Sequence, residues 1–271
     1  MISDPQKGRI AVLGRSYEMG TGVADDETWP YFLENDFYRG KFEVLNFGVE
    51  AYSWVQIEAT FHRFAKNFQP RCVLIPIFYE EIDSYTPLEA PPLPSGWRDS
   101  VSALNVAENF YLPRFIQQLF WWSIYRHGST DWNLLSRPVS RSKVSSLRGE
   151  HITSIIQRLS NATQKTGAHV VFVPMPRLVK TSDKLYRIGR NLLEIYQTAN
   201  PSIHVAREME DLQGTVTIHD IAIPGDPHLD PDFNRKIASK VHDALQNIPD
   251  CSLSNQKTEP ESMKQENPPK D

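Results

Sequence analysis

Short apolar runs alternate with amphipathic segments along most of the chain. Polar or turn-forming residues bound each of these runs, as they bound buried strands. The runs are residues 10–13, 42–46, 72–78 and 169–173. Apolar residues recur at helical spacing in residues 28–35, 55–68, 152–166, 184–198 and 231–246. Shorter strand candidates are residues 203–205 and 216–218. This order predicts an α/β protein whose parallel sheet carries helices on both faces.

The alternation stops between about residues 80 and 147. Residues 80–105 are rich in proline and predict a long loop over the carboxyl edge of the sheet. Residues 110–125 carry aromatic side chains at helical spacing, which fits a helix packed on the domain or an aromatic lid touching an apolar substrate or membrane. We therefore expect an arm at residues 1–8, a domain at 9–248 with an insertion at about 80–147, and a disordered polar tail at 249–271.

Composition narrows the class of protein. The 271 residues suit one domain, and a net charge of −4 gives no reason to expect a nucleic-acid partner. The eight histidines show no metal-ligand spacing, and Cys72 and Cys251 suggest neither a disulfide framework nor a zinc site. The polar amino terminus has no apolar signal-peptide core, and no apolar run is long enough to span a membrane. The sequence as written predicts a soluble cytoplasmic protein, or an extracytoplasmic one if an export segment was trimmed.

The candidate chemistry starts at Ser16. Gly14 ends the first apolar run, so a sharp turn would present Ser16 at the carboxyl end of a strand, the edge where open parallel sheets bind ligands. Backbone N–H groups at the start of a following helix point at an anion that forms beside the hydroxyl. The alternative is an ordinary polar loop.

A second candidate is the turn Asp226-Pro227-His228, just before the last predicted helix. His228 would take the proton from Ser16 as the hydroxyl attacks an acyl carbon, while Asp226 or a backbone carbonyl orients the ring. A serine early in the chain and an acid and histidine late in it form a workable triad order.

Three blocks of the sequence resemble the SGNH (GDSL-type) hydrolases. The family's first block, Gly-Asp-Ser and a glycine-bearing loop, is similar to GRSYEMGTGVADDETWP at residues 14–30. The second block resembles VLNFGVEAYS at residues 44–53, and the last resembles DPHLDPDFNRKIA at residues 226–238. The resemblance spans about residues 9–245. It implies a flavodoxin-like three-layer α/β/α fold with a central, mainly parallel five-stranded sheet.

The resemblance also implies site residues. Ser16 is the nucleophile, His228 the base and Asp226 the acid, and the N–H groups of Ser16 and Gly48 are oxyanion donors. Residues Arg15, Asn46, Tyr79 and Glu81 are expected to form the pocket. The family uses no cofactor, and no metal site is expected.

Three departures from the family pattern stand out. Arg15 replaces the aspartate of the first block, and Asp226 lies two positions before the histidine where three is commoner. Glu80 occupies the place of an asparagine whose amide donates to the oxyanion, and a carboxylate accepts hydrogen bonds but does not donate one unless protonated. Loss of one such donor typically lowers the rate by about 10²- to 10³-fold. Arg15 would either supply the missing positive charge or pair with Glu80.

Two functions remain open. The first is an esterase or acetyltransferase acting on a small acyl ester, above all an O-acetyl group on a carbohydrate. The second is a catalytically weakened relative that binds a glycan or a protein partner. A lipid-directed hydrolase rests only on the aromatic content of residues 110–125, and membrane contact is not expected. The sequence leaves the oligomeric state open.

Overall fold

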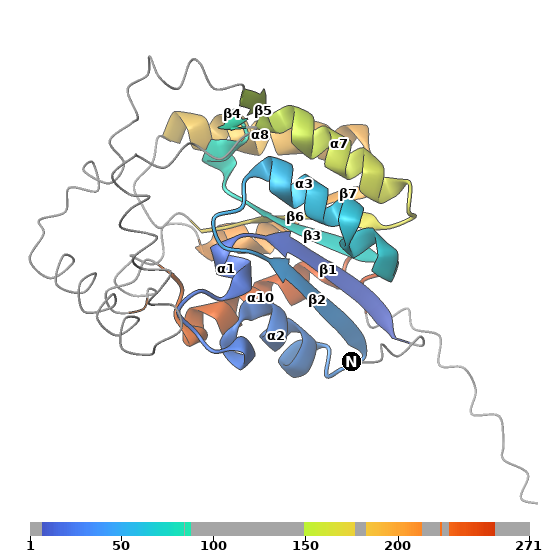
Figure 1. The fold of residues 1–271 in the computed structure, drawn as a ribbon, viewed down its shortest axis with the longest axis vertical. Helices are drawn as coiled ribbons and strands as arrows, with labels where there is room; N and C mark the ends of the chain where they lie inside the picture. Colours follow the sequence, from blue (N-terminus) through green and yellow to red (C-terminus); the bar gives the residue numbers. More distant parts are fainter. Residues whose placement is uncertain are drawn as a thin grey trace, which may run out of the picture.

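A five-stranded parallel sheet forms the centre of the molecule. The computed structural model describes residues 7–83, 85–87, 149–176, 183–212, 223 and 228–252. The strands of the sheet are β1 (Gly8–Gly14), β2 (Phe42–Gly48), β3 (Cys72–Ile77), β6 (His169–Pro174) and β7 (Ile203–Val205). They lie in the order β2-β1-β3-β6-β7, and every neighbouring pair is parallel (Figure 1). This is the flavodoxin-like strand order, and it confirms the predicted fold class.

The central strands are apolar throughout because both faces of the sheet are covered. In β1, Ile10 and Val12 contribute to the core on one face, and Ala11 and Leu13 to the core on the other. None of the four is exposed by more than 1%. Successive side chains of a strand point to opposite faces, so one short run supplies both cores.

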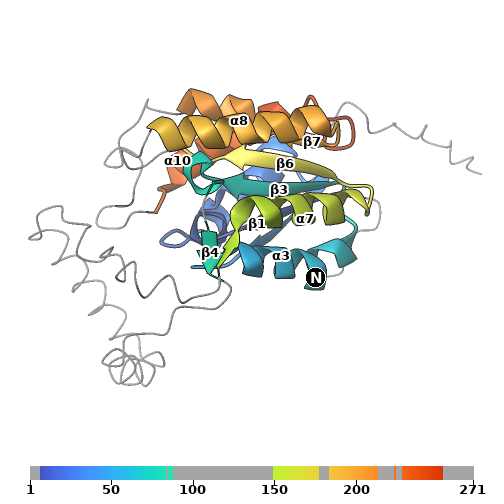
Figure 2. The same cartoon turned by 90° about the horizontal axis from the view of Figure 1, so that it is seen from above.

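Helices cover the two faces as separate layers (Figures 1 and 2). One layer contains α2 (Trp29–Phe32), extended by a π-helical turn at Leu33–Phe37, and α10 (Pro231–Leu245). The other contains α3 (Trp54–Arg63), α7 (Ile152–Gln164) and α8 (Asp183–Ala199). Short helical turns are α1 (Ser16–Met19), η1 (Asp25–Glu27), η3 (Ala65–Phe68), η4 (Tyr79–Glu81) and η5 (Arg207–Leu212). The predicted helix at 55–68 is therefore α3 followed by the separate turn η3.

A second, two-stranded sheet joins the two ends of the predicted insertion. It pairs β4 (Tyr85–Pro87) with β5 (Gly149–His151) in antiparallel register, with Pro87 opposite Gly149. The aromatic segment 110–125 and the strand candidate 216–218 lie outside the described residues. In the part of the chain that the structure describes, no helix is long and apolar enough to cross a membrane.

The two cysteines form a disulfide, although their positions in the sequence suggest no disulfide framework. Cys72 begins β3 and Cys251 follows α10, and both are fully buried. They are 179 residues apart in the sequence, and residue patterns do not reveal that the chain after α10 returns to the start of β3. Residues 249–252 of the expected tail are thus described, with Cys251 and Ser252 buried. Residues 253–271 lie outside the described part.

The disulfide predicts a large dependence of stability on oxidation. Closing a loop of 179 residues restricts the unfolded chain, and the chain-entropy model gives about 5 kcal/mol for it. We expect the double substitution Cys72→Ala and Cys251→Ala to lower the free energy of urea unfolding by a few kcal/mol. Dithiothreitol should lower the free energy of unfolding of the wild type and leave that of the double variant unchanged. Alkylation of both thiols in unfolded, unreduced protein would contradict the bond.

Candidate active site

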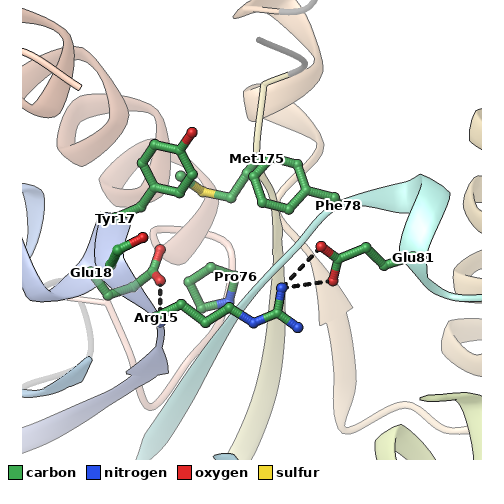
Figure 3. A pocket seen from close by; sticks show the side chains of 8 residues that line it. Arg15, Tyr17, Glu18, Pro76, Phe78, Glu81 and Met175 are labelled. Atoms are coloured by element: carbon green, nitrogen blue, oxygen red, sulfur yellow. Dashed lines mark hydrogen bonds and ion pairs between the residues drawn. The ribbon is translucent and has the colours of Figure 1, made fainter. Parts of the chain in front are cut away.

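Ser16 lies where the sheet reverses its strand order. It is the first residue of α1, directly after the carboxyl end of β1, and β1 pairs with β2 on one side and β3 on the other. Open α/β sheets bind ligands at this point. A cavity of about 150 Å³ is lined there by Arg15, Ser16, Tyr17, Glu18, Pro76, Phe78, Glu81 and Met175 (Figure 3).

Two glycines allow α1 to lie against the sheet. A Cβ atom at Gly14 would overlap the Glu18 side chain, and one at Gly48 would overlap the backbone of α1. Glu18 Oε2 accepts a hydrogen bond from the Arg15 backbone N–H at 2.7 Å, and Asn46 Nδ2 donates to the Glu18 carbonyl. These contacts fix the turn that carries Ser16.

Glu18 is a buried carboxyl group that the sequence analysis did not single out. Only 2% of the residue is exposed, and burial raises the pKa of its carboxyl group, while the hydrogen bond from the Arg15 backbone lowers it. Its Oε1 atom makes no hydrogen bond among the described residues. The nearby Trp29 indole also lowers the pKa of the Glu18 carboxyl group. Its N–H has no partner of good hydrogen-bond geometry among the described residues. An acidic residue in a polar loop is usually solvated, so residue patterns do not indicate this burial.

Arg15 is held by Glu81 rather than by Glu80. Its Nη1 atom donates to both carboxylate oxygens of Glu81, at 2.9 and 3.0 Å (Figure 3). The indole Nε1 of Trp54 donates to Glu81 Oε2 at 3.1 Å, and the Arg15 guanidinium lies 5.4 Å from the centre of that ring. An arginine within about 6 Å of an indole makes a cation–π interaction. The side chain of Arg15 thus has two fixed partners.

Two of the predicted pocket residues support the cavity without lining it. Asn46 fastens α1 to β2, as described above. Tyr79 is 2% exposed, and its hydroxyl donates to Glu210 Oε1 at 2.8 Å, on the side of α8 and η5. Gly189 of α8 packs so closely on the Tyr79 carbonyl that a Cβ atom would not fit. The segment after β3 therefore contributes Phe78 and Glu81 to the cavity, while Tyr79 faces α8 and Glu80 is not among the lining residues.

His228 lies beside the cavity. Its ring packs against Tyr17 with 5.6 Å between ring centres, and Tyr17 also packs against Phe78 at 5.9 Å. Within the described ranges, no hydrogen bond joins the Ser16 hydroxyl to the His228 ring. Asp230 caps α10 by accepting from the Phe233 N–H at 2.7 Å, which fixes the backbone just after the histidine. Asp226 lies outside the described residues.

The two predicted oxyanion donors differ in their surroundings. The Ser16 N–H belongs to the first turn of α1, where a helix offers no acceptor of its own. The Gly48 N–H donates to Asn46 Oδ1 at 2.9 Å. Among the residues described, no group of histidine, cysteine and acidic side chains is arranged to hold a metal ion.

Comparisons with known proteins place the fold. No family model matches the chain, and no curated protein matches it. Among solved structures, TesA aligns with a TM-score of 0.52 and 10% identity over 88% of this chain and 98% of TesA. A protein assigned to the lipolytic G-D-S-L family from Desulfitobacterium hafniense DCB-2 aligns with a TM-score of 0.51 and 10% identity over 88% of this chain and all of its own.

The chain has the fold of the SGNH hydrolases. The acetyl xylan esterase AlAXEase also aligns, with a TM-score of 0.52 and 12% identity over 88% of this chain and 99% of its own. Identities this low show the fold alone.

The buried Glu18 predicts a measurable pH dependence. Because its pKa is higher in the folded protein than the ordinary 4.5, the folded state binds the proton more tightly than the unfolded state. The free energy of unfolding should therefore fall as pH rises from the unfolded pKa through the folded pKa. Glu18→Gln should remove this loss in urea unfolding measured between pH 4.5 and 8.

The matched control is Glu27→Gln. Glu27 also caps a helical turn, accepting from the Ala24 N–H at 3.0 Å, but at an exposed site. Equal pH dependence in the wild type and Glu18→Gln would contradict a penalty from ionising Glu18.

Proposed function

We propose that this protein is a serine ester hydrolase or acetyltransferase that acts on small acyl esters, with an O-acetyl group on a carbohydrate as the preferred substrate. The observation that carries the proposal is the position of Ser16. It lines a cavity at the carboxyl end of β1, at the start of a helical turn, with His228 packed on the neighbouring Tyr17. The solved neighbours of the SGNH fold include acetylxylan esterases, which supports the carbohydrate ester.

The proposed mechanism uses Ser16 and His228. The Ser16 hydroxyl attacks the acyl carbon while His228 takes its proton, and Asp226 or a backbone carbonyl orients the imidazolium. The Ser16 N–H donates to the oxyanion, and Gly48 joins it if its N–H leaves Asn46. Water, or an alcohol in a transfer reaction, then releases the acyl group from Ser16.

The cavity volume supports a small acyl group. An apolar cavity of about 150 Å³ holds one benzene-sized molecule, and the cavity beside Ser16 has about this volume. An acetyl or butyryl group fits such a space, whereas an octanoyl chain exceeds it.

The buried disulfide supports a site of action outside the cytosol, since such bonds persist in oxidising compartments.

A second candidate function is a glycan- or protein-binding relative without turnover. It is favoured by the Glu81 carboxylate that lines the cavity. A carboxylate beside the reacting carbonyl opposes a developing negative charge unless it is neutralised.

An activity-based probe separates the two candidates. We expect a fluorophosphonate to label the wild type at Ser16, and Ser16→Ala and His228→Ala to lose both labelling and acetate release from p-nitrophenyl acetate by at least about 10³-fold. His62→Ala, an exposed histidine on α3, is the control and should keep wild-type activity. A folded wild type that neither labels nor releases acetate supports the binding protein.

Acyl-chain selectivity tests the size argument. We expect kcat/KM for p-nitrophenyl octanoate to be at least about tenfold below that for the acetate, because misfitting methylenes are costly in a tight pocket. Met175→Ala enlarges the cavity and should shift the preference toward longer chains. Met209→Ala removes an equally buried methionine of the same core away from the cavity, so it should lower stability and leave selectivity unchanged. The same shift in chain-length preference in both variants would contradict a role of the cavity in selecting the acyl group.

A further inference from the structure

We propose that Arg15 donates the side-chain hydrogen bond that stabilises the oxyanion in this site, and that Glu81 is the residue that positions it. This inference rests on the proposed ester chemistry. It accounts for two departures from the family pattern together, the arginine beside Ser16 and the absence of an amide donor after β3.

The cavity requires a donor that the segment after β3 does not provide. That segment brings Phe78 and Glu81 to the cavity, a side chain without a donor and a carboxylate. The Gly48 N–H already donates to Asn46. Among the described residues that line the cavity, Arg15 alone has a permanently charged donor group.

The guanidinium of Arg15 has donors left for a ligand. An arginine carries five N–H donors in a fixed fork, and Glu81 takes hydrogen bonds from the Nη1 atom alone. The Nε and Nη2 atoms make no hydrogen bond within the described residues. About 28% of the Arg15 side chain is exposed, and it lines the same cavity as Ser16, its neighbour in the chain.

The guanidinium is also held in place before any substrate arrives. Glu81 is fixed from a second side by the indole N–H of Trp54, which is 1% exposed in the core beneath α3. The indole ring itself lies beneath the guanidinium. A donor fixed in advance needs no reorganisation when charge develops, which is the main source of oxyanion stabilisation. The ion pair also neutralises the Glu81 carboxylate, whose charge would otherwise oppose the oxyanion.

The step is balanced without any further reagent. The bond from Ser16 Oγ to the acyl carbon forms as the carbonyl π pair moves onto oxygen, and the serine proton passes to His228. An Arg15 N–H donates to the oxyanion while it exists. The carbonyl then re-forms, the bond to the alcohol oxygen breaks, and that oxygen takes the proton from His228.

The test compares three substitutions of Arg15 with p-nitrophenyl acetate. We expect Arg15→Met to lower kcat by about 10²- to 10³-fold with KM changed only a few-fold, and Arg15→Lys to recover part of the loss. Millimolar methylguanidine should partly restore Arg15→Ala. The control is Arg9→Met, which removes an arginine of β1 whose ion pair with Glu43, at 2.8 Å, lies away from the cavity. It should keep wild-type kcat.

Glu81 is tested through Arg15. Glu81→Gln should lower kcat in the wild type and have no further effect in Arg15→Met, because a positioning residue acts only through the group it holds. Additive losses in the double variant would overturn its assignment.

Three outcomes would overturn the role of Arg15. The first is a kcat of Arg15→Met within twofold of the wild type, and the second is an effect of Arg15→Met on KM alone. The third is a loss of kcat that accompanies a lower unfolding midpoint and that neither Arg15→Lys nor methylguanidine added to Arg15→Ala relieves. All presuppose an active wild type. If the wild type itself neither labels with the fluorophosphonate nor releases acetate, the proposed function has failed before Arg15 is tested.

Discussion

The site at Ser16 depends on how the sheet holds α1, because four residues cannot form a stable helix on their own. The Glu18 side chain fills the space that Gly14 leaves open, and the backbone of α1 lies directly on Gly48. Asn46 ties the turn to β2 from the side. The position of the nucleophile is therefore set by close packing between β1, β2 and α1, and the buried carboxyl group is a cost of that packing.

Electrostatics in the cavity follow from the same arrangement. Three ionisable residues, Arg15, Glu18 and Glu81, line one small cavity, and their environments differ. Glu18 is buried, which favours its neutral form. Arg15 and Glu81 remain partly exposed and pair with each other against an indole ring. The charges of Arg15 and Glu81 thus offset each other beside Ser16, and their contacts fix the orientation of the guanidinium.

The sequence predicted the parts of the fold that local patterns determine. Continuous apolar runs identified β1, β3 and β6 because both faces of the sheet are covered, and the turns after β1 and before α10 marked the candidate site. Pairings across long distances in the chain were not predictable. The bond between Cys72 and Cys251, the choice of Glu81 as the partner of Arg15, and the turn of Tyr79 toward α8 all depend on how the elements pack.

The pairing of β4 with β5 has a consequence for how the chain is assembled. Pro87 lies opposite Gly149, so two positions that are far apart in the sequence meet at one place on the domain, as the two strands of a hairpin do. Among the described residues, every strand of the central sheet and every residue that lines the cavity lies before Pro87 or after Gly149. A joint of this kind allows the length of sequence between its two strands to change without moving the central sheet or Ser16.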